Sequence, residues 1–79
     1  MAMPERHKTT IQSFQIPQVE EAINATIFGA TNQSMARDVF VGDMTYEQAA
    51  EVYNMSVSGF HKHMRKIRRP MENYLQKLN

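Results

Sequence analysis

A dense run of basic side chains near the end of the chain is the part of this 79-residue sequence best suited to chemistry. Residues 57–69 contain five Lys or Arg, two His, and no Asp or Glu. Residues 1–56 hold three basic and seven acidic side chains, so the net charge of +1 conceals the asymmetry. A concentrated positive field attracts polyanions. The run therefore predicts a polyanion-binding surface, and the alternative is a basic helix face that serves only solvation.

Other kinds of chemistry find little support in the sequence. The absence of cysteine excludes disulfides, thiolate metal sites and thiol catalysis. His61 and His63 are two residues apart, so on a helix they point about 200° away from each other and cannot pair as metal ligands. There is no nucleophile–base set and no phosphate-cradling Gly loop. We therefore expect no enzyme activity, no cofactor, no metal and no small-molecule ligand.

The length and composition fit one small helical domain. A chain of 79 residues supports one core but not two. No apolar run approaches the roughly 18 residues of a membrane span, and the N-terminus lacks the apolar stretch of a secretory signal. Residues 1–13 show no clear periodicity and are expected to form a flexible arm. The expected domain then covers residues 14–69, and a C-terminal helix covers residues 70–79.

The first two helices are predicted from apolar spacing. One should start between residues 14 and 18, carry Val19, Ile23 and Ile27 on one face, and stop near Gly29. The next should follow Thr31 or Asn32 as its cap and end at Gly42. Its predicted buried residues are Met35, Val39 and Phe40.

Three further helices follow in the prediction. Thr45 and Gln48 have the capping-box spacing that begins a helix, and Ser56 is a cap for the helix after it. Pro70 should stop or kink that helix, and a last helix would cover roughly residues 71–78. Short helices joined by short turns predict an all-α bundle of four to five helices.

The segment from residue 45 to residue 67 has the layout of a helix-turn-helix. Ala50 is small enough for the point where two helices cross, and Asn54 suits a turn that needs a positive φ. Met55 and Phe60 then point inward and hold the second helix against the first. Offsets of 0, +4, +5 and +10 between these four positions form a fairly specific pattern.

Helical geometry separates an apolar face of the basic helix from a polar one. At about 100° per residue, Phe60, Met64 and Ile67 share one side. A helix whose other side carries Ser, His, Lys and Arg suits the major groove of DNA. The candidates for contacts to base edges are Val57, Ser58, His61, Lys62 and Arg65. The candidates for phosphate contacts are Tyr46, Gln48, Ser56, Lys66, Arg68 and Arg69, although Gln48 has a second interpretation as the capping partner.

The tail has heptad-like spacing that suggests an interface. Such modules usually act as two-fold dimers on inverted half-sites, so a homodimer is expected. The candidate dimer residues are Met71, Tyr74, Leu75 and Leu78. The alternative is that this stripe packs onto the first helix within one chain, and the sequence leaves both open.

Residues 17–69 resemble the TrfB/KorA type of plasmid transcriptional repressors. The similarity rests on QVEEAI, MARDVFVGDMTYEQAAEVYNMS and HKHMRKI, and covers about two thirds of the chain. It implies a small homodimeric repressor that binds palindromic operators, controls plasmid or mobile-element genes, and resides in the bacterial cytoplasm with the nucleoid or plasmid. It also implies base contacts by Val57, Ser58, His61, Lys62 and Arg65. This chain departs from the family at Asn54, where Gly is usual, and in its short C-terminal extension.

Two alternatives remain beside a sequence-specific, double-stranded DNA-binding repressor. The stretch TYEQAAEVYNMSVSGFHKHMRKIRRPMENYL also resembles the promoter-recognition region of sigma factors, which would make this a sigma-like or activator module. The second alternative is a helical adaptor that binds an acidic protein partner. RNA binding is disfavoured, because the polar helix face offers no aromatic platform for stacking bases.

Overall fold

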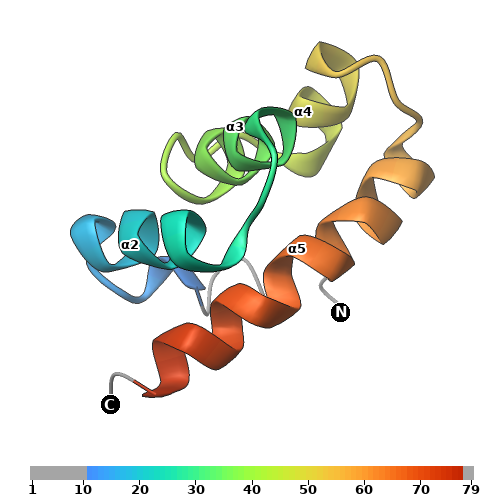
Figure 1. Ribbon diagram of the computed structural model, residues 1–79. Helices are drawn as coiled ribbons and strands as arrows, with labels where there is room; N and C mark the ends of the chain where they lie inside the picture. Colours follow the sequence, from blue (N-terminus) through green and yellow to red (C-terminus); the bar gives the residue numbers. More distant parts are fainter. Residues whose placement is uncertain (1–10, 78–79) are drawn as a thin grey trace, which may run out of the picture.

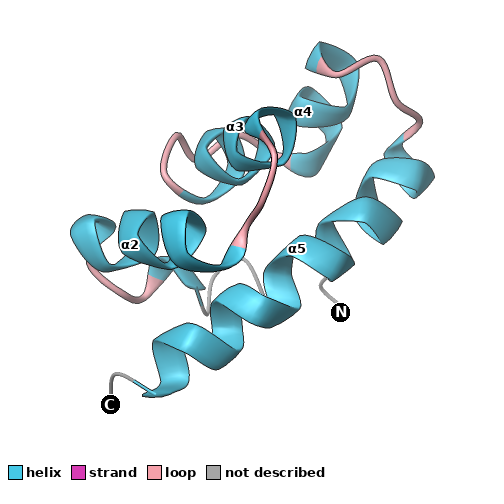
Figure 2. Ribbon diagram, in the orientation of Figure 1, coloured by secondary structure: helices cyan, strands magenta, loops and turns pink. Residues whose placement is uncertain are grey.

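The computed structural model describes residues 11–77, and within them every regular element is a helix, as predicted (Figures 1 and 2). A short helical turn at residues 11–12 precedes four helices. These are α2 (Ile16–Thr26), α3 (Ala30–Phe40), α4 (Tyr46–Val52) and α5 (Val57–Lys77). The 21-residue α5 runs along one side of the molecule, with α4 packed near its start and α2 near its end (Figure 1). This long helix therefore supports the rest of the fold.

The predicted apolar stripe of α2 is confirmed. The helix starts at Ile16, inside the expected range, and the backbone amide of Gln15 donates to Gln18 Oε1 at 3.2 Å before its first turn. Val19 and Ile23 are buried, and Ile27 is buried immediately after the helix ends. Helix α2 therefore joins the core through the side that the spacing indicated.

The expected start of the next helix was wrong by two or three residues. Gly29, predicted to stop the preceding helix, is instead the N-cap of α3, with a φ of 94° that favours glycine. Thr31 and Asn32 consequently lie inside α3 rather than capping it. The predicted buried residues Met35, Val39 and Phe40 are confirmed.

The prediction of a stop at Pro70 and a separate last helix after it was wrong: α5 continues through Pro70 to Lys77. A proline inside a helix removes one backbone hydrogen bond and costs about 3 kcal/mol. Beyond it, Met71 and Leu75 are fully buried, and each such side chain contributes about 1.5–3 kcal/mol. Burial of the two together exceeds the cost of the proline, so the helix continues.

The prediction of a flexible arm over residues 1–13 was wrong for residues 11 and 12. Ile11 is fully buried, and Gln12 Nε2 donates to the Phe40 carbonyl and to Asp43 Oδ1, both at 3.3 Å. The chain is therefore attached to the end of α3 from residue 11 onward. Residues 1–10 lie outside the described part of the chain.

Candidate nucleic-acid interface

The helix α4 begins with the capping arrangement that the sequence predicts. The Gln48 amide donates to Thr45 Oγ1, and the Thr45 amide donates to Gln48 Oε1, both at 3.0 Å. Ala49 and Ala50 are buried where α4 packs against its neighbours. Their small side chains allow this seven-residue helix to lie close to α3 and α5.

The turn between α4 and α5 also has the predicted geometry. Asn54 has a φ of 56°, in the left-handed region that asparagine tolerates. The Met55 amide then donates to the Ala50 carbonyl at 2.8 Å, and Ser56 Oγ accepts from the Gly59 amide at 3.0 Å. Phe60 is fully buried and Met55 packs against the core. This arrangement is compatible with a helix-turn-helix.

Tyr53 anchors this turn to α3 in a way the sequence did not reveal. Its hydroxyl donates to Asp38 Oδ2 and also pairs with Ser34 Oγ, each at 2.6 Å. Its ring stacks on Phe60 with centroids 6.4 Å apart. Burial, and then the hydrogen bond to Asp38, raise the pKa of Tyr53 above its usual value. No local sequence signal pairs residue 53 with residue 38.

The outward side of α5 is polar from end to end. Its buried side chains Phe60, Met64 and Ile67 lie on the inner side, together with Met71 and Leu75. At about 100° per residue, the direction opposite to these buried side chains falls near Lys62 and Arg69. The exposed polar residues grouped around that direction are Ser58, Lys62, Arg65, Lys66, Arg69, Asn73 and Gln76. Among residues 57–77 no Asp or Glu is exposed, since Glu72 is half-buried.

The structure brings most predicted base-contacting residues together on this outward side. Ser58, Lys62 and Arg65 are exposed on this side. Val57 lies in the direction of the buried residues and is 42% exposed because it is the first residue of α5. His61 lies on the flank of the helix and is half-buried, with its ring 4.6 Å from that of Tyr46. His61 therefore offers an edge at the margin of the surface rather than at its centre.

The predicted phosphate-contacting residues divide into two groups. Ser56, Lys66 and Arg69 are exposed, near the start of α5 and along it. Gln48 is exposed but its side chain completes the cap of α4, as the second interpretation proposed.

Tyr46 and Arg68 do not belong to the exposed surface. Tyr46 was wrongly predicted as a phosphate contact: it is 1% exposed and packs edge-on against Phe60 in the core. Its aromatic ring fills space between α4 and α5, and burial of that ring keeps the hydroxyl away from the surface. Arg68 is half-buried, and its Nε lies 3.7 Å from Glu72 Oε2 one turn later on the same helix.

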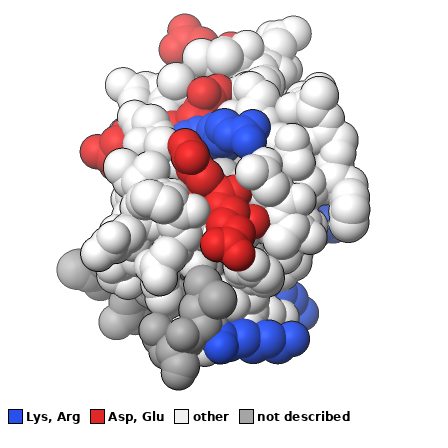
Figure 3. Space-filling view, turned by 60° about the vertical axis from the view of Figure 1, so that its left-hand side comes forward, with Lys and Arg blue, Asp and Glu red and all other residues white. Residues whose placement is uncertain are grey.

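Charge is segregated over the surface. Exposed acidic residues lie on α2 and α4, at Glu20, Glu21, Glu47 and Glu51. In the face shown in Figure 3, acidic side chains run down the middle with one basic group beside them in the upper part, and other basic atoms lie at the right and lower margins. The exposed basic residues of α5 therefore form a surface distinct from the acidic one.

The predicted dimer residues are mostly occupied within one chain. Met71 and Leu75 are both 0% exposed, because they lie in the core between α5 and the other helices. Tyr74 is half-buried and its hydroxyl donates to Glu21 Oε2 on α2 at 2.7 Å. Leu78 lies outside the described residues. Assigning Met71 and Leu75 to a dimer interface was therefore wrong, and the alternative of packing within the chain holds for them.

Comparisons with protein-family models, curated proteins and solved structures find no match to this chain. The similarity to TrfB/KorA-type repressors thus stays a prediction from the residues quoted above. Among residues 11–77, no group of three or more His, Asp or Glu side chains is arranged to hold a metal ion. None of the helices in that range combines the length and the apolar character that crossing a membrane requires.

Proposed function

We propose that the chain is a sequence-specific, double-stranded DNA-binding repressor that places the outward side of α5 in the major groove. The observation that carries the proposal is the division of α5 into a buried apolar side and an exposed side without an acidic residue. The major groove is about 12 Å wide and admits one helix. Because α5 is held by the core along its whole length, its polar side chains are presented on a rigid support.

The positions along α5 suggest different contacts. Ser58, Lys62 and Arg65 point away from the core in the first half of the helix, where a recognition helix meets base edges. Arginine and lysine favour the O6 and N7 atoms of guanine, and the exposed Val57 suits a thymine methyl group. His61 would contribute only from the flank. These side chains supply the sequence preference.

Phosphate contacts would fix the register of the protein on the duplex. Lys66 and Arg69 are exposed and follow the base-contacting residues on the same side. Ser56 and the first amides of α5 lie at the positive end of the helix dipole, which favours a phosphate. Such contacts strengthen binding without distinguishing sequences.

Repression, a palindromic operator and plasmid-associated or nucleoid-associated genes in the bacterial cytoplasm belong to the same proposal through the similarity stated above. A single recognition helix contacts few base pairs, so a homodimer on inverted half-sites would supply the remaining specificity. The interface would have to use side chains other than the buried Met71 and Leu75.

The test is selection of binding sites from random duplexes, followed by anisotropy titrations with the selected and a scrambled duplex. We expect Arg65→Ala to raise the Kd for the selected site about 5- to 150-fold and to relax its sequence preference. The matched control is Arg37→Ala, which removes an exposed arginine from α3. Arg37→Ala should change the Kd less than about twofold.

Two results would contradict the proposal. One is equal affinity for the selected and the scrambled duplex at every salt concentration. The other is an equal loss of affinity in Arg65→Ala and Arg37→Ala, which would show that general charge and not the surface of α5 governs binding. The inverted symmetry of the selected sites, or its absence, tests the homodimer separately.

A further inference from the structure

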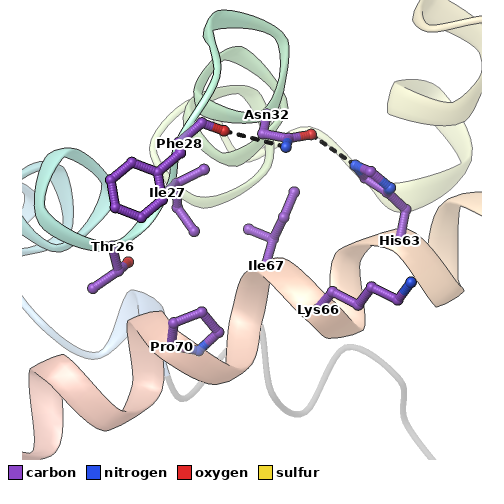
Figure 4. Close-up of a pocket in the computed structure, with 8 residues that line it drawn as sticks. All are labelled: Thr26, Ile27, Phe28, Asn32, His63, Lys66, Ile67 and Pro70. Atoms are coloured by element: carbon purple, nitrogen blue, oxygen red, sulfur yellow. Dashed lines mark hydrogen bonds between the residues drawn. The ribbon is translucent and has the colours of Figure 1, made fainter.

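A hollow of about 250 Å³ lies where the loop after α2, the start of α3 and the middle of α5 meet (Figure 4). Its described lining is mainly apolar, from Ile27, Phe28, Ile67 and Pro70. Polar groups reach it from Thr26, Asn32, His63 and Lys66. These residues come from segments far apart in the sequence, and only folding assembles them.

One wall of the hollow is held in place by hydrogen bonds. His63 Nε2 on α5 pairs with Asn32 Oδ1 on α3 at 2.8 Å, and Asn32 Nδ2 donates to the Phe28 carbonyl at 3.3 Å (Figure 4). This chain of contacts joins α5, α3 and the loop before α3. The hollow is therefore formed before anything enters it, as is usual for small-molecule sites.

Phe28 is the feature of this region that the fold itself does not explain. Its ring is 80% exposed, the highest value among the large apolar side chains of the described residues. It stands at the edge of an apolar hollow rather than in the core. Covering an exposed aromatic ring is favourable by about 25 cal/mol for each Å² of apolar surface removed from water. A flat apolar group that enters the hollow would cover it.

The charge around the hollow selects an anion. Lys66 and Pro70, which line it, also line a neighbouring depression together with Arg65 and Arg69. No Asp or Glu is among the described residues that line either one. A carboxylate placed at this rim would gain a charge-assisted hydrogen bond from Lys66, whereas a cation would be repelled.

We propose that this hollow binds a small aromatic carboxylate, with its ring against Phe28, Ile67 and Pro70 and its carboxylate at Lys66. A volume of about 250 Å³ lies just below the ~300–1,000 Å³ typical of ligand pockets, so the ligand has one or two rings. This site is separate from the proposed DNA contacts except at Lys66, and it stands whether or not the chain binds DNA.

The experiment uses the full chain without DNA and titrates 1-naphthoate while recording ¹H–¹⁵N NMR spectra. A matched neutral probe, 1-naphthalenemethanol, has the same rings without the charge. We expect saturable one-to-one binding of the naphthoate, with shifts concentrated at the lining residues, and binding of the alcohol at least tenfold weaker. Phe28→Ala and Lys66→Gln should each raise the Kd at least fivefold.

Two control variants match these changes elsewhere on the molecule. Val52→Ala removes another exposed apolar side chain, which is 62% exposed on α4, and Lys77→Gln removes an exposed cation of α5 that does not line the hollow. Each should leave the Kd within about twofold of the unsubstituted protein. Because Phe28 and Lys66 are both exposed, their variants should keep the helical circular dichroism spectrum.

Several outcomes would overturn the proposal. These are no saturation up to about 1 mM, equal binding of the neutral alcohol, or equal losses in the control variants. Shifts at the lining residues that depend on protein concentration alone would show that a second copy of the chain covers the hollow instead. Failure of DNA binding has no bearing on any of these measurements.

Discussion

Replacing Tyr53 by Phe removes one hydroxyl and leaves the ring that stacks on Phe60. That hydroxyl donates to Asp38 and pairs with Ser34, so it joins the turn before α5 to α3. A hydrogen bond to a charged group contributes about 1.5–3 kcal/mol. Because Tyr53 is only half-buried, water will replace part of the loss. We therefore expect Tyr53→Phe to lower the free energy of unfolding by about 1–2 kcal/mol.

A double-mutant cycle separates this hydrogen bond from other effects of the two side chains. Urea unfolding at pH 7 would be measured for the unsubstituted chain, Tyr53→Phe, Asp38→Asn and the double variant. We expect a coupling of about 1 kcal/mol between the two positions and a Tm about 4–16 °C lower in Tyr53→Phe. A coupling below about 0.3 kcal/mol would refute the reasoning, since contacting partners should not act additively.

The pH dependence gives a second measurement of the same contact. Burial and the Asp38 hydrogen bond raise the pKa of Tyr53, so the folded state favours the neutral phenol. A raised pKa contributes stability below the ordinary tyrosine value of about 10, and that stability is lost as the pH rises through the folded-state pKa. Tyr74, whose pKa is raised mainly by its hydrogen bond to Glu21, titrates in the same direction. The stability difference between the unsubstituted chain and Tyr53→Phe should therefore shrink above about pH 10. Tyr74 is present in both proteins, so its titration cancels from this difference.

Two further substitutions test the packing of α5. Pro70→Ala restores a backbone donor inside the helix. It should raise the free energy of unfolding by about 1–2 kcal/mol, after allowance for the greater freedom of the unfolded chain. Lower stability in thermal unfolding would contradict this, because it would show that packing of the proline ring stabilises the fold by more than the missing backbone hydrogen bond costs. Ala50→Leu should lower it by about 1–3 kcal/mol, because position 50 is 1% exposed and the added volume must displace neighbours. Ala25→Leu on the exposed side of α2 is the control and should stay within about 0.5 kcal/mol; equal losses in the two alanine variants would contradict the close approach at Ala50.

The turn before α5 was predictable because its determinants are local. The cap at Thr45, the left-handed residue at Asn54 and the cap at Ser56 each act within a few residues along the chain. The apolar spacing that buries Phe60 and Met64 is a property of one helix. Such features are visible in a sequence without knowledge of what packs against them.

The remaining features depend on contacts between distant segments. Pro70 predicted an end or a kink, and the helix does not end there, because the burial of Met71 and Leu75 beyond it outweighs the local preference. Tyr46 carries a polar group that suggested a surface role, although its ring fills the core. The hollow beside Phe28 requires three segments to meet, so no spacing in the sequence indicates it.

The continuity of α5 connects the stability of the fold with the proposed contacts to DNA. The same helix that buries Phe60 near its start buries Leu75 near its end, so its rotation about its own axis is fixed along its whole length. That fixed rotation determines the direction of Lys62 and Arg65. If α5 had ended at Pro70, it would lose the buried Met71 and Leu75 and the contact of Tyr74 with Glu21 on α2, and ordering its first half would oppose binding. The contact of α2 with the second half of α5 therefore supports the exposed surface of the first half without touching DNA.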